Sequence, residues 1–172
     1  MPNDGIDVSF LSVADSHLSM LHGWLSEPHV RQWWGDPDKE LESIRDGCAS
    51  GEVEGFIFHV DGKPAGYIQS WTPSQYDEPW AKDLPSDTPG VDIFVGPPEM
   101  TGKGIAALAL KAFAERLFEN GAVRIVIDPD AGNRRAVRAY SKAGFVPFGE
   151  WIDESGRTLL MELTRTEFER NS

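Results

Sequence analysis

The chain has 172 residues, of which 40% are hydrophobic, and its 28 acidic and 16 basic side chains give a formal net charge of -12. So acidic a protein is a poor partner for nucleic acid or an anionic membrane, because both are bound through clustered Lys and Arg. The same charge favours a cationic small-molecule partner, although acidity also serves solubility.

A chain of this length can bury one core without help from a metal or a disulfide, so residues 1–172 are expected to form a single domain. Cys48 is the one cysteine, which excludes an internal disulfide. The sequence shows no charged-then-apolar leader and no long apolar span, so we expect a cytoplasmic protein. We expect it to be a monomer or a homodimer.

Hydrophobic periodicity in the first 71 residues predicts a strand, two helices and a hairpin. These are, in chain order, a strand at 8–13, a helix capped by Asp15 and running through Leu25, a loop at 28–35 with Trp33 and Trp34, a helix at 37–49, and alternating runs at 55–60 and 65–71 joined by Asp61-Gly62-Lys63. The hairpin signal is strong because Asp-Gly is a preferred two-residue turn.

Residues 72–90 are rich in Pro, Asp and Ser, which predicts a long surface loop of the kind that is usually functional or disordered. The later elements are a strand at 91–95, a helix from Thr101 or Gly102 to Asn120, a strand at 123–127, a helix capped by Asn133 and ended by Gly144, a strand from Phe145, a turn at 153–156 and a closing strand at 158–163.

The turn between the strand at 91–95 and the long helix that follows it contains two glycines, Gly102 and Gly104. Glycine lets a backbone approach a ligand closely, and the amides of residues 102–106 would point from the positive end of the helix dipole. The sequence therefore predicts that a diphosphate binds at this turn.

Two other kinds of phosphate loop fit this turn less well. A Walker A loop needs four residues between its first glycine and Gly-Lys-Ser/Thr, but five residues separate Gly96 from Gly102, and Gly104 stands in place of the hydroxyl. Gly102, Gly104 and Ala107 fit a dinucleotide fingerprint. That fingerprint opens a doubly wound domain, however, and only about 70 residues follow it here.

Thr101, Gly102, Lys103, Gly104, Ile105 and Ala106 resemble the acyl-coenzyme A turn of the GCN5-related N-acetyltransferases (GNATs), Gln/Arg-x-x-Gly-x-Gly/Ala, except at Thr101. Residues 133–145 resemble the coenzyme A-flanking helix of the same family, N-x-x-A-x-x-x-Y-x-x-x-G-F. The resemblance implies the GNAT fold, an α/β (α+β) architecture whose mixed, mostly antiparallel sheet of about seven strands is flanked by about four helices. It also implies that acetyl-CoA is bound by Phe94, Val95, residues Thr101 to Ala106, Asn133, Ala136 and Tyr140.

Nearly the whole chain after about residue 28 is similar to the aminoglycoside 6'-N-acetyltransferases within this family, through Trp33-Trp34-Gly35, Gly66-Tyr67-Ile68-Gln69-Ser70, an acidic Trp-bearing loop, Asp128-Pro129 and residues 140–145. An aminoglycoside has ammonium groups on sugar rings, so its site needs carboxylates and a flat aromatic wall. We expect the acceptor to contact Trp33, Trp34, Asp77, Glu78, Trp80, Asp92, Asp128 and Asp130. Solvated acids and core tryptophans are the alternative interpretation.

Acetyl transfer to nitrogen needs a neutral amine, because an ammonium has no lone pair. Asp92 is the expected base, directly or through water, provided that desolvation lowers the pKa of the amine and nearby carboxylates raise that of Asp92. A backbone amide at Phe94 or Val95 would hold the oxyanion. Tyr140 would protonate the leaving thiolate, with simple packing as its alternative role.

Other functions stay open at this point. A siderophore-type acyltransferase acting on hydroxylysine usually brings a histidine to the acceptor, and no histidine follows His59. A polyamine or protein N-acyltransferase and a non-catalytic acyl-CoA-binding module are further alternatives, the last of which would release no thiol. The four histidines lack the ligand spacing of a metal site, so we expect no metal.

Overall fold

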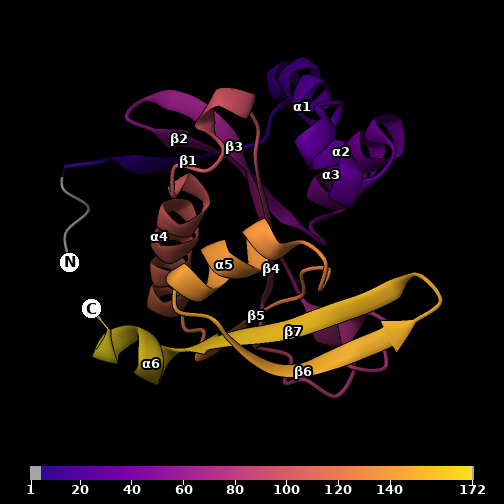
Figure 1. Cartoon of the computed structure of the whole chain (residues 1–172), viewed down its shortest axis with the longest axis vertical. Helices are drawn as coiled ribbons and strands as arrows, with labels where there is room; N and C mark the ends of the chain where they lie inside the picture. Colours follow the sequence, from indigo (N-terminus) through magenta and orange to yellow (C-terminus); the bar gives the residue numbers. More distant parts are fainter. Residues whose placement is uncertain (1–4, 172) are drawn as a thin grey trace. The chain divides into compact units, whose positions relative to one another are not determined.

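The computed structural model describes residues 5–171, and in this range the chain forms six α-helices and seven strands (Figure 1). The strands belong to one mixed sheet in the order β1-β2-β3-β4-β5-β7-β6, which confirms the predicted fold class. The chain divides into two compact units. The N-terminal unit comprises the residues up to 70 together with 93–106, and the C-terminal unit comprises 71–92 and 107 onward.

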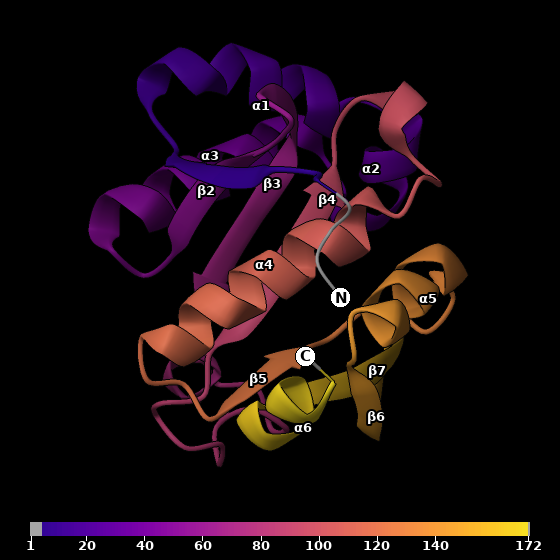
Figure 2. The same ribbon diagram turned by 90° about the vertical axis from the view of Figure 1, so that its left-hand side faces the viewer.

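The N-terminal unit packs three helices against a meander of antiparallel strands, as Figure 2 shows. Its elements are β1 (Val8–Ser12), the 3₁₀ turn η1 (Asp15–His17), α1 (Leu18–Leu25), α2 (Pro28–Trp34), α3 (Pro37–Ser50), β2 (Glu54–Val60), β3 (Lys63–Trp71, to Ser70 in this unit), the second half of β4 (Gly90–Val95) and the 3₁₀ turn η3 (Pro98–Met100). The core joins Leu21, Trp24, Leu25, Val30 and Ile44 of the helices to Ile57, Tyr67 and Phe94 of the strands.

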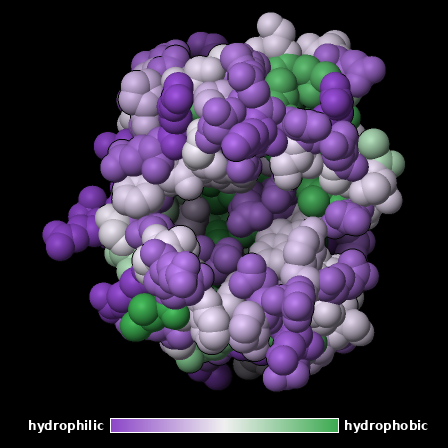
Figure 3. Space-filling model, turned by 90° about the vertical axis from the view of Figure 1, so that its right-hand side faces the viewer, coloured by the Kyte–Doolittle hydropathy of each residue, from purple (hydrophilic) through white to green (hydrophobic). Residues whose placement is uncertain are grey.

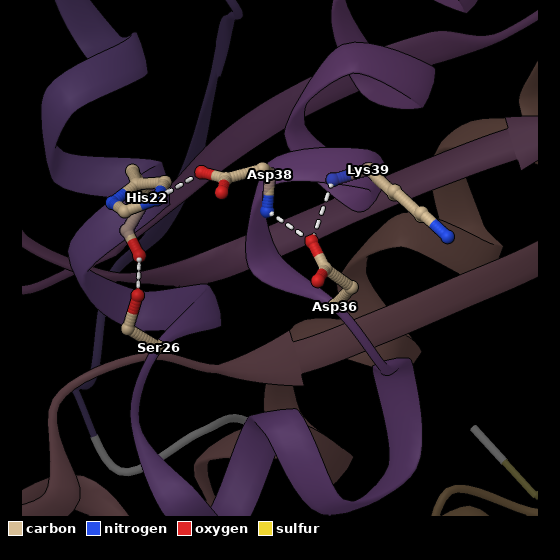
Figure 4. Close-up of polar contacts among 5 residues, drawn as sticks. All are labelled: His22, Ser26, Asp36, Asp38 and Lys39. Atoms are coloured by element: carbon tan, nitrogen blue, oxygen red, sulfur yellow. Dashed lines mark hydrogen bonds and ion pairs between the residues drawn. The ribbon is translucent and has the colours of Figure 1, made fainter.

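Local sequence signals explain where several of these elements begin. Asp36 caps α3, because one oxygen of its carboxylate accepts hydrogen bonds from the backbone amides of Asp38 (2.9 Å) and Lys39 (3.1 Å), as Figure 4 shows. His22 of α1 contacts the carboxylate of Asp38 at 2.8 Å and so ties α1 to the start of α3. The hairpin turn has positive φ at Asp61 and Gly62, which are the angles that its Asp-Gly sequence favours.

Two expectations for this unit are wrong. Residues 28–35 were expected to form a loop, but Pro28 starts the helix α2, where its missing amide costs nothing and where Val30 turns into the core. Asp15 was expected to cap the first long helix. It lies instead in η1, and α1 begins at Leu18 without a side-chain cap.

The C-terminal unit builds the other half of the sheet. It contains the 3₁₀ turn η2 (Pro73–Gln75), the first half of β4, α4 (Ile105–Glu119, from Ala107 in this unit), β5 (Arg124–Ile127), α5 (Arg134–Lys142), β6 (Val146–Asp153), β7 (Gly156–Thr164) and α6 (Arg165–Arg170). β4 runs parallel to β5, whereas β7 is antiparallel to both β5 and β6. The long loop before β4 is confirmed, since η2 is its one regular element. α6 was not predicted, although it has a capping residue: the hydroxyl of Thr164 accepts a hydrogen bond from the backbone amide of Glu167.

Hydrophilic side chains cover most of the face shown in Figure 3, and hydrophobic residues form separate small patches there. Within residues 5–171, no helix combines the length and the apolar character that crossing a membrane requires.

Gly96 gives a direct test of packing in the N-terminal unit. A Cβ built on Gly96 would lie 2.2 Å from the ring of Trp24, so we expect Gly96→Ala to lower the free energy of unfolding by about 1–3 kcal/mol. Gly23→Ala on α1 is the matched control, because its Cβ would meet nothing within 4 Å and should stabilise the helix by up to about 1 kcal/mol. Chemical denaturation measures both, and equal stabilities for the two variants would contradict this packing.

Candidate active site

The predicted phosphate turn has the backbone geometry of an anion site. Gly102 and Gly104 have φ values of 74° and 76°, in the left-handed region that favours glycine. The helix α4 begins at Ile105, after both glycines, and not at Thr101 or Gly102 as predicted. The first amides of an α-helix have no acceptor within the helix, so the amides at the start of α4 are available to an anion.

The surroundings of the turn are consistent with a diphosphate ligand. A Cβ at Gly102 would meet nothing within 4 Å, and both Gly102 and Lys103 are exposed, so the backbone is open at this point. The hydroxyl of Thr101 donates a hydrogen bond to the carbonyl of Pro98 at 2.7 Å. Thr101 therefore shapes the loop that precedes the glycines.

Two of the predicted acids, Asp92 and Asp128, interact electrostatically within the C-terminal unit. Gly90 of β4 is paired in parallel with Val126 of β5. Asp92 and Asp128 each lie two residues further along the chain, Asp128 just after the end of β5. Both residues are half-buried. Burial raises the pKa of Asp128 well above that of an ordinary aspartate, and the negative charge of Asp92 raises it further.

A third acid, Glu78, belongs to this group. It is exposed on the loop after η2, and its charge contributes to the raised pKa of Asp128. We call Glu78, Asp92 and Asp128 the acidic group. The other two predicted acids, Asp77 and Asp130, are both exposed, and the carboxylate of Asp130 accepts a hydrogen bond from the amide of Gly132 at 2.8 Å.

Tyr140 of α5 is linked electrostatically to the acidic group. Its side chain is 8% exposed, and burial followed by the charges of Asp92 and Asp128 raises the pKa of its hydroxyl. The phenol therefore keeps its proton at neutral pH, as a proton donor must. Asn133 holds the beginning of the same helix, because its side chain accepts a hydrogen bond from the amide of Ala136 at 3.3 Å.

The tryptophans predicted to contact the acceptor lie in different environments. In α2, Trp33 is 39% exposed, whereas Trp34 packs edge-on against the ring of Phe94 with 5.1 Å between ring centroids. At least one side of the Trp34 ring is therefore packed in the core. Phe94 is itself buried and belongs to the core of the N-terminal unit.

Sequence reasoning missed an aromatic group around Trp80. Trp71, at the end of β3, packs edge-on against Trp80 (6.4 Å between centroids) and against Tyr76 (5.1 Å). The Trp71 indole nitrogen is buried and has no hydrogen-bond partner among residues 5–171. The one sequence signal for this group was a Trp at the end of a hairpin strand that leads into an aromatic-bearing loop.

A metal site and a cysteine nucleophile are the two other kinds of reactive site to consider. Within residues 5–171, no three His, Cys, Asp or Glu side chains gather in a way that could hold a metal ion. Burial raises the pKa of Cys48, which disfavours the thiolate that a nucleophile would need.

Because Asp128 is less acidic in the folded chain, its ionisation opposes folding. Its folded pKa lies above the ordinary value of 3.8, so the folded state holds the proton more tightly and stability falls as the pH rises above 3.8 toward the raised pKa. We expect Asp128→Asn to raise the Tm by about 2–4 °C at neutral pH and to flatten the pH dependence of stability. Thermal unfolding from about pH 4 to about pH 8 measures this. Asp83→Asn, at an exposed loop acid, is the control, and an equal gain there would attribute the effect to net charge.

Comparisons with known proteins show the family of this chain. A family model described as an acetyltransferase (GNAT) domain matches residues 13–152. Aminoglycoside N(6')-acetyltransferase type 1 from Klebsiella pneumoniae is 30% identical over 177 residues, which cover 98% of this chain and 87% of the relative. A kanamycin resistance protein from Rhizobium radiobacter is 34% identical over 92 residues, which cover 53% of this chain and 85% of the relative.

A crystal structure of aminoglycoside acetyltransferase AAC(6')-Ib in complex with coenzyme A and kanamycin has the same fold, with a TM-score of 0.86 and 30% identity. The alignment covers 95% of this chain and 98% of that chain. The family match over most of the sequence and the near full-length relative show that the chain belongs to the GNAT acetyltransferases.

Proposed function

We propose that this protein transfers the acetyl group of acetyl-CoA to an amine of a cationic small molecule, namely the 6'-amine of an aminoglycoside. The observation that carries the proposal is the acidic group beside the buried, neutral Tyr140. The similar protein of Klebsiella pneumoniae is named for the same amine, and the similar AAC(6')-Ib was crystallised with kanamycin. The family match spans both units, which supports one catalytic domain.

The acidic group favours a polycationic acceptor on electrostatic grounds. The half-buried carboxylates of Asp92 and Asp128 repel each other, and the carboxylate of Glu78 adds to the repulsion. An ammonium placed among them removes that repulsion and forms charge-assisted hydrogen bonds, which are about twice as strong as neutral ones. Trp80 and Trp33 would supply apolar surface for sugar rings.

The acyl donor is proposed to bind at the phosphate turn. The amides of residues 102–106 would hold its diphosphate, and Asn133 and Ala136 would lie along it as the family resemblance implies. When bound, acetyl-CoA supplies an acetyl group activated as a thioester.

The residues of this chain then carry out two proton transfers and stabilise the negative charge that develops on the thioester oxygen. Asp92 accepts the proton that the attacking amine loses, directly or through a water, as the new C–N bond forms. The backbone amide of Val95 or Phe94 faces the thioester oxygen while it gains negative charge. Tyr140 donates its proton to the sulfur as the C–S bond breaks. Acid–base catalysis of this kind contributes about 10²- to 10⁴-fold to a rate.

A thiol-release assay tests the function directly. Purified protein with acetyl-CoA should release thiol with kanamycin-like aminoglycosides and much less with spermidine or hydroxylysine. Asp92→Asn should lower kcat by about 10²-fold or more with nearly unchanged affinity for acetyl-CoA, because an amide cannot accept the proton. Turnover confined to spermidine or hydroxylysine would identify another acceptor. Binding of acetyl-CoA without thiol release would mean a binding module.

Tyr140→Phe separates proton donation from packing. The variant keeps the ring in the core and loses only the hydroxyl, so kcat should fall by about 10²-fold without weaker aminoglycoside binding. Because the pKa of Tyr140 is raised from an ordinary value of 10.0, wild-type kcat should show no loss assignable to this phenol up to about pH 10. Steady-state kinetics and calorimetry measure the two effects, and a wild-type rate would leave Tyr140 only its packing role.

A further inference from the structure

His29 of α2 makes a hydrogen bond that no sequence pattern indicated. Its Nε2 lies 2.9 Å from the backbone carbonyl oxygen of Val95 in β4, within the N-terminal unit. A carbonyl can only accept, so Nε2 carries the hydrogen and donates it. His29 is half-buried, and its neighbour Val30 anchors α2 in the core.

The peptide group that joins Val95 to Gly96 is held from both sides. Its carbonyl accepts from His29, and its N–H donates to the carbonyl of Ala65 in β3 at 2.9 Å. The ring of Trp24 occupies the space next to Gly96 that a Cβ would need. Helices α1 and α2 and strand β3 therefore all meet the end of β4.

These contacts also fix the direction of the Val95 amide. The carbonyl oxygen of Phe94 approaches β3, because a Cβ on Gly66 would lie 2.1 Å from it. Successive residues of a strand direct their backbone groups to opposite edges, and the N–H and C=O of one residue share an edge. The N–H of Val95 therefore faces the edge that His29 occupies, away from β3.

We propose that His29 is a positioning residue, which orients the backbone of Val95 so that its N–H can face the thioester oxygen of the acyl donor. This inference rests on the proposed function and selects Val95 over Phe94 as the amide donor. The amide of Phe94 is directed toward β3, whereas that of Val95 lies on the opposite edge. His29 itself touches neither substrate nor reacting atoms.

The test compares His29→Ala with His29→Gln, whose side-chain nitrogen can occupy the place of Nε2 and donate the same hydrogen bond. His29→Ala should lower kcat by about 10- to 100-fold with the acetyl-CoA KM changed less than about twofold, because a displaced donor weakens binding of the charged transition state. His29→Gln should recover most of the rate. Gln32→Ala, at an exposed site on α2, is the control and should behave as wild type.

Two kinetic results would overturn the proposal. One is an unchanged kcat in His29→Ala, and the other is a loss that His29→Gln does not rescue while both variants keep the wild-type Tm. If the wild-type protein acetylates none of the amines, the proposed function fails. Amide hydrogen exchange then still tests whether His29 holds the peptide group between Val95 and Gly96. The amide of Gly96 should exchange faster in His29→Ala than in wild type or His29→Gln, and equal rates would exclude this role of His29.

Discussion

The site depends on one interaction, the repulsion between Asp92 and Asp128, which follow the paired residues Gly90 and Val126 along the chain. Burial raises the pKa of Asp128, and the negative charge of Asp92 raises it further. Burial, followed by the charges of Asp92 and Asp128, likewise raises the pKa of the Tyr140 hydroxyl. Burial and the same carboxylate charges thus set the protonation behaviour of Asp128 and of Tyr140.

The site also requires that side chains pack closely against the backbone of β4, and a glycine permits this at each end of the strand. In the C-terminal unit, a Cβ at Gly90 would collide with the indole of Trp71, and in the N-terminal unit a Cβ at Gly96 would collide with Trp24. Each glycine thus lets a tryptophan lie directly on the strand. The strand carries Asp92 and the Val95 amide between these fixed ends, so neither group depends on a mobile loop for its position.

Sequence reasoning located the features whose signals are local. The glycines of the phosphate turn, the Asn133 cap and the Asp-Gly hairpin each lie within a few residues of what they determine. The helix α2 was missed because Pro28 and Gly35 bracket a segment too short to show helical periodicity. The His29 bond spans 66 residues, and the coupling of Asp128 to Glu78 depends on how a long loop folds, so neither follows from spacing.

The raised pKa of Asp128 also connects stability with recognition. Under the proposed function, a proton and a cationic acceptor would both relieve the repulsion between Asp128 and Asp92 and so would compete for the same carboxylate. Binding of an ammonium should therefore release a proton from whatever fraction of Asp128 is still protonated, and the loss of that proton costs part of the binding free energy. When the ligand is absent, a site that keeps like charges close together lowers the free energy of unfolding of the protein. Under the proposed function, the bound cation would relieve the repulsion within this pair.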